Sequence, residues 1–379
     1  MKIARRGGID PFIAMEVMKA ANERQAAGGD VIHMEVGQPS TGAPRTVRDA
    51  AMRALGSDRL GYTEALGIPP LRAAIAKHYR DYYGLAVAPE RIVVTTGSSG
   101  AFLLAFLAVF DHGDRIGVAE PGYPAYRNIL TALGIEMIPL PSRAESGFRL
   151  DASQLRRAGA MDGILVATPA NPTGTMLDLA RLQGLVDVAE ERNIALIVDE
   201  IYHGITYGGR AQSVLALTDK AIVINSFSKY FSMTGWRLGW MVLPEVLIRP
   251  VECLAQNLFI SPPSLSQWAA IAAFDAHDEL EANVARYAAN RALLLDELPS
   301  AGFDRLAPVD GAFYIYADVS RLTNDSVAFS RRMLKEIGVA ATPGLDFDRA
   351  EGRHFMRFSF AGSTQEMREA ARRLRDWRK

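Results

Sequence analysis

The sequence has very little cysteine and no long apolar run. Its one cysteine, Cys253, excludes an internal disulfide, and we therefore expect a reducing, cytoplasmic location. The longest apolar run, residues 101–110, has ten residues and is too short to cross a bilayer. The basic first residues, MKIARRGGIDPF, lack the apolar stretch of a signal peptide. These absences exclude a disulfide-stabilised scaffold and disfavour a membrane protein.

An excess of charge of either sign is also missing. The 42 basic and 43 acidic side chains leave a formal net charge of −1. Binding to nucleic acid or to an anionic membrane requires a basic surface, so neither partner is expected. The six histidines show no HExxH or other metal-ligand spacing, and no metal site is predicted.

The composition that is present is that of an ordinary globular protein, with 49% hydrophobic and 22% charged residues. A helix is predicted at residues 68–83. Beyond it, short β-branched runs alternate with helical stretches through the middle of the chain. Strands are predicted at residues 91–96, 115–119, 163–168, 194–199 and 221–225. This alternation predicts an α/β fold with a mostly parallel sheet covered by helices on both faces.

The pattern changes after about residue 265. A long helix is predicted for residues 267–298, strands for 312–317 and 355–359, and helices for 326–337 and from 364 onward. This predicts a smaller α+β domain. Because the alternation begins only near residue 91, the N-terminal segment is expected to pack with that domain. We predict a large domain at residues 38–270 and a small domain built from 1–37 and 271–379.

The most informative stretch, IVINSFSKYFSMTGWRLG, covers residues 222–239 and begins as a strand. Lys229 lies just past the strand end, where a desolvated amine loses its proton easily and becomes nucleophilic. Ser226 and Ser228 before it, and Arg237 after it, would form a phosphate clamp. The combination suggests a phosphorylated aldehyde cofactor held as an imine. Taken alone, the same motif is better explained by a surface lysine in a helix-capping loop, and the other motifs of the chain reverse that preference.

Two other strand ends carry glycine and polar residues. Gly97-Ser98-Ser99-Gly100 opens a helix, and its free amides and hydroxyls suit a phosphate, although an ordinary Gly/Ser turn would look the same. Asn171 lies in Pro169-Ala170-Asn171-Pro172-Thr173-Gly174, a turn that feeds a helix. Its amide can hydrogen-bond a phenolic oxygen or a carboxylate. Ligands of parallel sheets bind at such carboxyl ends.

Four further residues suit an aromatic, charged ligand. Asp199 ends an apolar strand and needs a cationic partner such as a protonated pyridine nitrogen, unless it caps a helix. Tyr202 can donate to a ring oxygen. Tyr123, in a Pro-Gly-Tyr-Pro turn, can lie on an aromatic ring or simply pack the turn. Arg357 in an apolar strand requires a carboxylate, either a substrate's or the protein's own.

The order and spacing of these motifs resemble a known family. NPTG, then DEIY, then SFSK with an arginine eight residues later, then MRFSF, resemble the class I and II aminotransferases of fold type I, the aspartate aminotransferase superfamily. The resemblance extends from VGQPS near Gly37 to Arg357. It implies pyridoxal 5′-phosphate (PLP) as cofactor, a large PLP-binding domain, and a small domain made from both chain ends.

The resemblance also implies residue roles. Lys229 looks like the lysine that holds the cofactor and then moves a proton, and Asp199 like the partner of the pyridine nitrogen. Tyr202 and Asn171 look like partners of the ring oxygen, and Tyr123 like the stacking residue. The phosphate site would consist of Ser98, Ser99, Ser226, Ser228 and Arg237, and the α-carboxylate site of Gly37, Asn171 and Arg357. Tyr62, in Gly61-Tyr62-Thr63-Glu64, resembles a tyrosine that reaches the phosphate of the neighbouring subunit, although it could pack within its own chain.

The implied function is ping-pong transfer of an amino group between an L-amino acid and a 2-oxo acid by a homodimer with shared active sites. A PLP-dependent carbon–sulfur β-lyase or a ring-forming synthase would use the same cofactor residues. A lyase would turn over on the amino acid alone, whereas an aminotransferase would stop after one half-reaction. A DNA-binding regulator with this fold is not expected, because the fold begins within the first few dozen residues and the net charge is near zero.

One departure from the family pattern concerns the substrate. Family members that prefer aspartate or glutamate use a second arginine for the distal carboxylate, and no arginine here matches it. Ile9, Phe12 and Tyr123 would make the side-chain pocket more apolar, but core packing explains Ile9 and Phe12 equally well.

Overall fold

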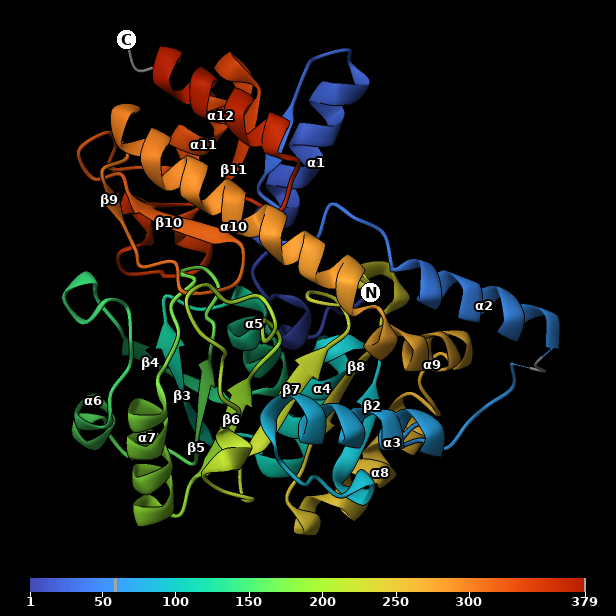
Figure 1. Ribbon diagram of the computed structural model, residues 1–379. Coiled ribbons are helices and arrows are strands. Elements are labelled where there is room, and N and C mark those ends of the chain that lie inside the picture. Colours follow the sequence, from blue (N-terminus) through green and yellow to red (C-terminus); the bar gives the residue numbers. More distant parts are fainter. Residues whose placement is uncertain (58–59, 378–379) are drawn as a thin grey trace.

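The computed structural model describes residues 1–57 and 60–377 and contains two β-sheets with their helices (Figure 1). The larger sheet has seven strands in the order β2-β8-β7-β6-β5-β3-β4. Its strands are β2 (Ile92–Thr95), β3 (Arg115–Glu120), β4 (Glu136–Pro141), β5 (Gly163–Ala167), β6 (Ala195–Asp199), β7 (Ile222–Ser226) and β8 (Gly239–Val242). Neighbouring strands from β4 to β7 pair in parallel, and β8 is antiparallel to β2 and β7. The mostly parallel sheet is therefore confirmed, with one antiparallel strand that needs no crossover helix.

Helices cover both faces of this sheet. The helices of this part of the chain are α2 (Arg45–Ser57), α3 (Pro69–His78), α4 (Gly97–Val109), α5 (Pro124–Leu133), α6 (Ala152–Arg157), α7 (Leu179–Arg192), α8 (Glu245–Leu258) and α9 (Ser264–Ile271). α2 packs on α9 and projects to one side of the sheet (Figure 1). Alternate residues of each strand belong to different cores. Ile197 packs on the α4 side, while Val198 belongs to the core of the opposite face. Because both faces are buried, the strands read as continuous apolar runs and not as alternating ones.

The five-stranded sheet joins the two chain ends, with the order β1-β11-β12-β10-β9. Its strands are β1 (Ile32–Met34), β9 (Arg305–Leu306), β10 (Tyr314–Asp318), β11 (Val339–Pro343) and β12 (Phe355–Ser359). The helices here are α1 (Ile13–Ala26), α10 (His277–Ser300), α11 (Ser326–Ile337) and α12 (Thr364–Trp377). β1 pairs in parallel with β11, so the N-terminal segment packs beside the C-terminal elements (Figure 1). The domain boundaries at residues 38 and 270 stay predictions.

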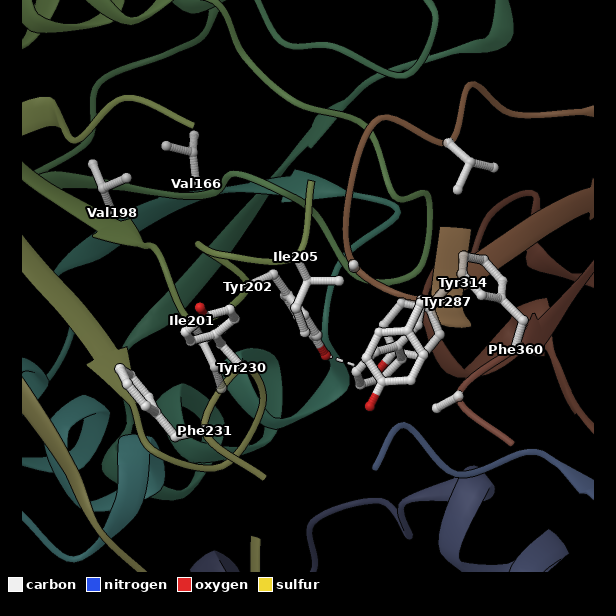
Figure 2. Packing of buried hydrophobic residues seen from close by; sticks show 14 of the residues in the cluster. Val166, Val198, Ile201, Tyr202, Ile205, Tyr230, Phe231, Tyr287, Tyr314 and Phe360 are labelled. Carbon is white, nitrogen blue, oxygen red and sulfur yellow. Dashed lines mark hydrogen bonds between the residues drawn. The ribbon is translucent and has the colours of Figure 1, made fainter. Parts of the chain in front are cut away.

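One core runs from the first sheet into the elements around the second. Val166 and Val198 of the large sheet belong to the same buried cluster as Tyr287, Tyr314 and Phe360. Figure 2 shows this cluster, with the Tyr202 ring pointing from the segment after β6 toward Tyr314. The segments between the two sheets therefore pack against residues of both. No helix within residues 1–57 and 60–377 combines the length and apolar character that crossing a membrane would require.

Two predicted helices differ from the observed ones. The predicted helix 267–298 is wrong: α9 ends at Ile271, a 3₁₀ turn follows at Ala272–Asp275, and α10 begins at His277. The break places Phe274 against Phe227 and Phe231, with ring centroids 5.6 and 5.3 Å away, so tertiary packing overrides local helix propensity. The helix predicted at 68–83 becomes α3 and then a π-helical turn, Tyr79–Tyr83.

Candidate active site

A cavity of about 430 Å³ lies between the two sheets, beyond the carboxyl ends of β5, β6 and β7. All of the predicted site residues except Ser226 and Tyr62 line it. They are Gly37, Ser98, Ser99, Tyr123, Asn171, Asp199, Tyr202, Ser228, Lys229, Arg237 and Arg357. The carboxyl ends of parallel strands meet at one edge of the sheet, and this arrangement gathers residues that are far apart in sequence.

Lys229 follows β7 and is the one lysine among the described residues that lines the cavity. Its Nζ donates a hydrogen bond to the carbonyl oxygen of Gly37 at 2.6 Å. Burial, together with the positive charge of Arg357, lowers the pKa of Lys229 to about 8. A Cβ at position 37 would lie 1.7 Å from the Tyr314 hydroxyl, so only glycine fits there. Its lowered pKa and its position in the cavity allow the amine to act as a nucleophile.

Asp199 is the last residue of β6 and is buried. Its carboxylate accepts hydrogen bonds from the Ile201 amide at 3.0 Å and from the Tyr126 hydroxyl. Burial raises the pKa of Asp199 to about 6. The segment that follows is a turn and not a helix, so the helix-cap alternative does not hold. Within the described part of the chain no ion pair includes Asp199, and a cation in the cavity would supply the missing partner.

Tyr202 and Tyr314 meet at the boundary between the two sheets. Their hydroxyl oxygens are 2.7 Å apart, and both rings are buried (Figure 2). Burial raises the pKa of Tyr202 well above its ordinary value, so the phenol keeps its proton and can act as a donor.

Arg357 is a buried cation that forms no ion pair with any described residue. Its guanidinium donates to Asn171 Oδ1 at 2.9 Å, to Thr342 Oγ1 at 3.2 Å and to the Glu35 carbonyl. Its plane lies over the Tyr314 ring, 4.5 Å from the centroid. Nε has no partner, and among residues 1–57 and 60–377 no carboxylate lies within 4 Å of the guanidinium. The sequence left undecided whether a carboxylate of the protein pairs with Arg357, and no such ion pair is observed among these residues. The guanidinium can therefore bind a carboxylate that enters the cavity.

The start of α4 also carries groups that suit an anion. Thr96, the residue before the helix, provides no side-chain cap, and the first amides of an α-helix have no acceptor within the helix itself. A Cβ at Gly97 would lie 2.6 Å from an Arg237 Nη, so glycine allows the guanidinium to approach the helix end. Ser98, Ser99 and Ser228, which carry hydroxyl groups, also line the cavity. Helix amides, hydroxyls and an arginine together suit a phosphate.

Ser226 and Tyr62 lie outside the cavity. Ser226 Oγ donates to Ser228 Oγ at 2.9 Å and accepts from the Ser228 amide at 3.0 Å, so it positions Ser228. Tyr62 is 86% exposed, so its side chain makes little contact with the described part of its own chain. Its predicted role across a subunit interface stays a prediction.

One apolar part of the cavity wall comes from α1 and the residue before it. Ala14, Met15 and Met18 line it, together with Phe12, whose ring meets Tyr123 edge-on at 5.6 Å. Asp346 accepts hydrogen bonds from the amides of Ile13 and Ala14, both at 3.0 Å, and so caps α1 from the other end of the chain. Phe12 thus belongs to the cavity wall. Ile9 is exposed and contributes to neither the cavity nor the core of this chain.

Sequence reasoning did not identify Tyr126, Tyr314 or Asp346. Tyr126 follows Tyr123 by three residues and therefore lies on the same face of α5, a spacing that could have indicated it. Tyr314 and Asp346 carry no local signal, since their partners are more than 100 residues away.

Comparison with known proteins supports one family. The model of the family "Aminotransferase class I and II" matches residues 29–374. A valine–pyruvate aminotransferase of Mycobacterium tuberculosis is 51% identical over 99% of this chain and 98% of its own length. A crystal structure of an aminotransferase from Mycobacterium tuberculosis matches with a TM-score of 0.98 at 50% identity, covering 100% of this chain and 99% of its own.

A more distant structure, the aspartate aminotransferase of Thermus thermophilus with maleate, matches with a TM-score of 0.94 at 31% identity, covering 99% of each chain. These relatives are aminotransferases, so transamination is supported and the carbon–sulfur β-lyase alternative is not favoured. The family generally depends on PLP. The chain belongs to the class I and II aminotransferases and is an aminotransferase.

Proposed function

We propose that the protein binds PLP at Lys229 and transfers amino groups between an apolar L-amino acid and a small 2-oxo acid by a ping-pong mechanism. One observation carries this proposal: a buried amine with a lowered pKa and a buried arginine without a counterion face the same cavity. An amino acid that enters can place its carboxylate on Arg357 while its nitrogen approaches Lys229.

The residues present fit a phosphorylated pyridine aldehyde. The free amides at the start of α4, with Ser228 and Arg237, would hold the phosphate. Asp199 would hold the pyridine nitrogen in its protonated form, and Tyr202 with Asn171 would donate to the ring oxygen. When bound, the cofactor supplies an electron sink for the substrate Cα electrons. Lys229 would move the proton that leaves Cα.

The substrate side chain would meet an apolar wall. Met15 and Met18 of α1 lie in the same wall as Phe12. Lys229, Arg237 and Arg357 are the cationic residues among the described ones that line the cavity, and each has a role at the cofactor or the α-carboxylate. No cation of this chain is left there for a distal carboxylate. The relative named valine–pyruvate aminotransferase, at 51% identity, supports the same substrate class.

A screen of amino donors against 2-oxo acids tests the substrate class. We expect kcat/KM for valine with pyruvate to exceed that for aspartate with pyruvate by on the order of 10- to 100-fold, because a distal carboxylate would lose its hydration without gaining a partner. Incubation with valine alone should stop after one half-reaction. Equal or better use of aspartate would contradict the apolar pocket, and sustained turnover without a 2-oxo acid would contradict transamination.

The proposal includes a two-fold homodimer with shared active sites. Several large apolar side chains of α2, of the segment after it, of the end of α8 and of the segment before α9 are exposed. They are Met52, Leu55, Tyr62, Leu258 and Ile260. The Ser264 hydroxyl donates a hydrogen bond to the Gly61 carbonyl, and the Thr63 amide donates one to the Ser261 hydroxyl. The segment that carries Tyr62 therefore lies against the start of α9. A second copy of the chain would cover this apolar surface.

Mixing two inactive variants tests whether Tyr62 acts across the dimer. After subunit exchange, Tyr62→Ala and Lys229→Ala chains should regain activity, because one site of each mixed dimer combines a native Tyr62 with a native Lys229. Random exchange of equal amounts would restore about one quarter of native activity. Steady-state assays after confirmed exchange measure it.

A control pair is Lys229→Ala with Asp199→Ala. Lys229 and Asp199 of one chain contribute to the same active site, so neither residue is supplied by the partner. Both residues line the cavity of one chain, so their mixed dimers contain no intact site and should stay inactive. Mixed dimers of the Tyr62 pair without recovered activity would refute the shared site, provided that Tyr62→Ala alone is severely impaired.

A cytoplasmic location completes the proposal. Cys253 is unpaired and partly buried. A reducing compartment keeps such a thiol free. Amino acids and 2-oxo acids are the small-molecule partners, and neither nucleic acid nor a membrane is required.

A further inference from the structure

A buried histidine joins three segments behind the cavity. His203 lies in the turn directly after Tyr202 and is 5% exposed. Its Nε2 is 3.0 Å from the Thr168 carbonyl, at the start of the loop that leads to Asn171. Its Nδ1 is 2.7 Å from the hydroxyl of Tyr83, the last residue of the π-helical turn after α3. The carboxyl oxygen Oε2 of Glu200 lies 3.5 Å from the same nitrogen, and burial raises the pKa of Glu200 to about 8. His203 itself does not line the cavity.

The partners determine which ring nitrogen carries the proton. A backbone carbonyl can only accept, so Nε2 must donate to Thr168. Burial lowers the pKa of His203 to about 3, and the imidazole is neutral. In a neutral ring the second nitrogen accepts, so the Tyr83 hydroxyl donates to Nδ1. The Thr168 carbonyl thus selects the tautomer, and Tyr83 holds the ring in that orientation by donating to Nδ1.

The two loops joined by His203 carry two residues of the proposed cofactor site. Thr168 and Asp199 already share one backbone hydrogen bond at 3.0 Å, between the Thr168 amide and the Asp199 carbonyl. From that point one segment continues to Asn171 and the other through Tyr202. The His203–Thr168 bond is a second link between them, and it is made by a residue that does not line the cavity.

We propose that His203 is a positioning residue, which holds Tyr202 and Asn171 at a fixed separation so that both reach the ring oxygen of the cofactor, with Tyr83 orienting the imidazole. This inference rests on the proposed binding of PLP in the cavity. Tyr83 extends the arrangement to a π-helical turn that ends at Gly84 in the left-handed conformation, with φ of +72°. Single π-helical turns often occur at functional sites.

Two conservative substitutions separate the two hydrogen bonds of His203. In His203→Gln the amide nitrogen can take the place of Nε2 and donate to Thr168. In His203→Asn the shorter amide can reach Tyr83 only. His203→Ala removes both bonds, and Tyr83→Phe removes the orienting donor. If positioning of the loops matters, His203→Gln should resemble the native enzyme, and His203→Asn should resemble His203→Ala.

The readout is the pH midpoint of the visible absorbance of the bound cofactor, measured by spectrophotometric titration. Weaker donation to the ring oxygen leaves that oxygen more negative, so the chromophore retains its proton to higher pH. We expect His203→Ala and His203→Asn to raise the midpoint by about half to one pH unit and to lower kcat/KM about tenfold. Tyr83→Phe should shift the pH midpoint in the same direction by a smaller amount. The double variant Tyr83→Phe/His203→Ala should have the same midpoint as His203→Ala alone.

Ser330→Ala is the matched control. Ser330 is buried, and its hydroxyl donates to the Ala341 carbonyl in the five-stranded sheet, so this variant loses a buried hydrogen bond away from the proposed ring-oxygen site. It should lower the thermal stability of the cofactor-free protein without moving the midpoint. If His203→Ala does not fold, the Gln and Asn variants with Tyr83→Phe decide the question.

Three outcomes would overturn the inference. They are a native midpoint in His203→Ala, equal shifts in the Gln and Asn variants, and a shift in Ser330→Ala as large as that of His203→Ala. A native enzyme without cofactor on Lys229 after borohydride reduction would refute the proposed function and this inference together. A native titration with unaffected His203 variants would refute the inference alone.

Discussion

Replacing Lys229 by alanine is expected to reduce kcat by roughly 10⁴-fold, the upper end of what a positioned acid–base group contributes. The variant loses both the covalent attachment point and the group that moves the Cα proton. No other lysine among the described residues lines the cavity, so no neighbour can substitute. Steady-state kinetics with the preferred donor and acceptor measure the loss.

Chemical labelling identifies the lysine directly. Borohydride reduction of the native enzyme, followed by peptide mapping, should place the cofactor on the peptide that contains Lys229. Lys220→Ala is the matched control, because Lys220 is an exposed lysine paired with Glu190 at 3.1 Å and should be dispensable. A cofactor fixed to another lysine, or a Lys229→Ala enzyme with near-native turnover, would exclude the assignment.

Replacing Asp199 by alanine should reduce kcat by roughly 10²- to 10³-fold, the second-largest loss that we expect. The magnitude is that seen when one fixed electrostatic group is removed from an active site. Without the carboxylate the pyridine nitrogen loses its proton, and the ring accepts electrons poorly. Cofactor binding should weaken but persist, because Arg237 and the start of α4 still hold the phosphate. Kinetics and equilibrium titration with PLP measure the two effects separately.

The pH dependence of cofactor binding provides a further check on Asp199. Its pKa in the cofactor-free protein is raised to about 6, so the carboxylate is ionised above that pH and protonated below it. Binding of a protonated pyridine favours the ionised form. Affinity for PLP should therefore be full above about pH 6 and decrease as the pH falls below it. In Asp199→Asn that decrease should disappear. An Asp199→Ala enzyme with native turnover would reduce Asp199 to a structural role.

Local sequence was sufficient to locate the edge of the large sheet that borders the cavity. Lys229, Asp199 and Asn171 each follow an apolar run that could only be a buried strand, and parallel strands bring their carboxyl ends together. Their grouping therefore follows from periodicity and connection rules, without knowledge of any side-chain contact. The mostly parallel sheet was predictable for the same reason.

Only the tertiary structure decided what surrounds these residues. Arg357 and Asn171 are 186 positions apart, and the distance between their side chains depends on how the two sheets pack. Whether Arg357 had a carboxylate of its own could not be predicted, since a counterion can come from any element. The helix break that seats Phe274, the capping of α1 by Asp346 and the link from His203 to Thr168 are likewise long-range contacts. The sequence determined which chemistry this protein carries at its strand ends, whereas the geometry that orients this chemistry came from packing between distant segments, which local patterns do not encode.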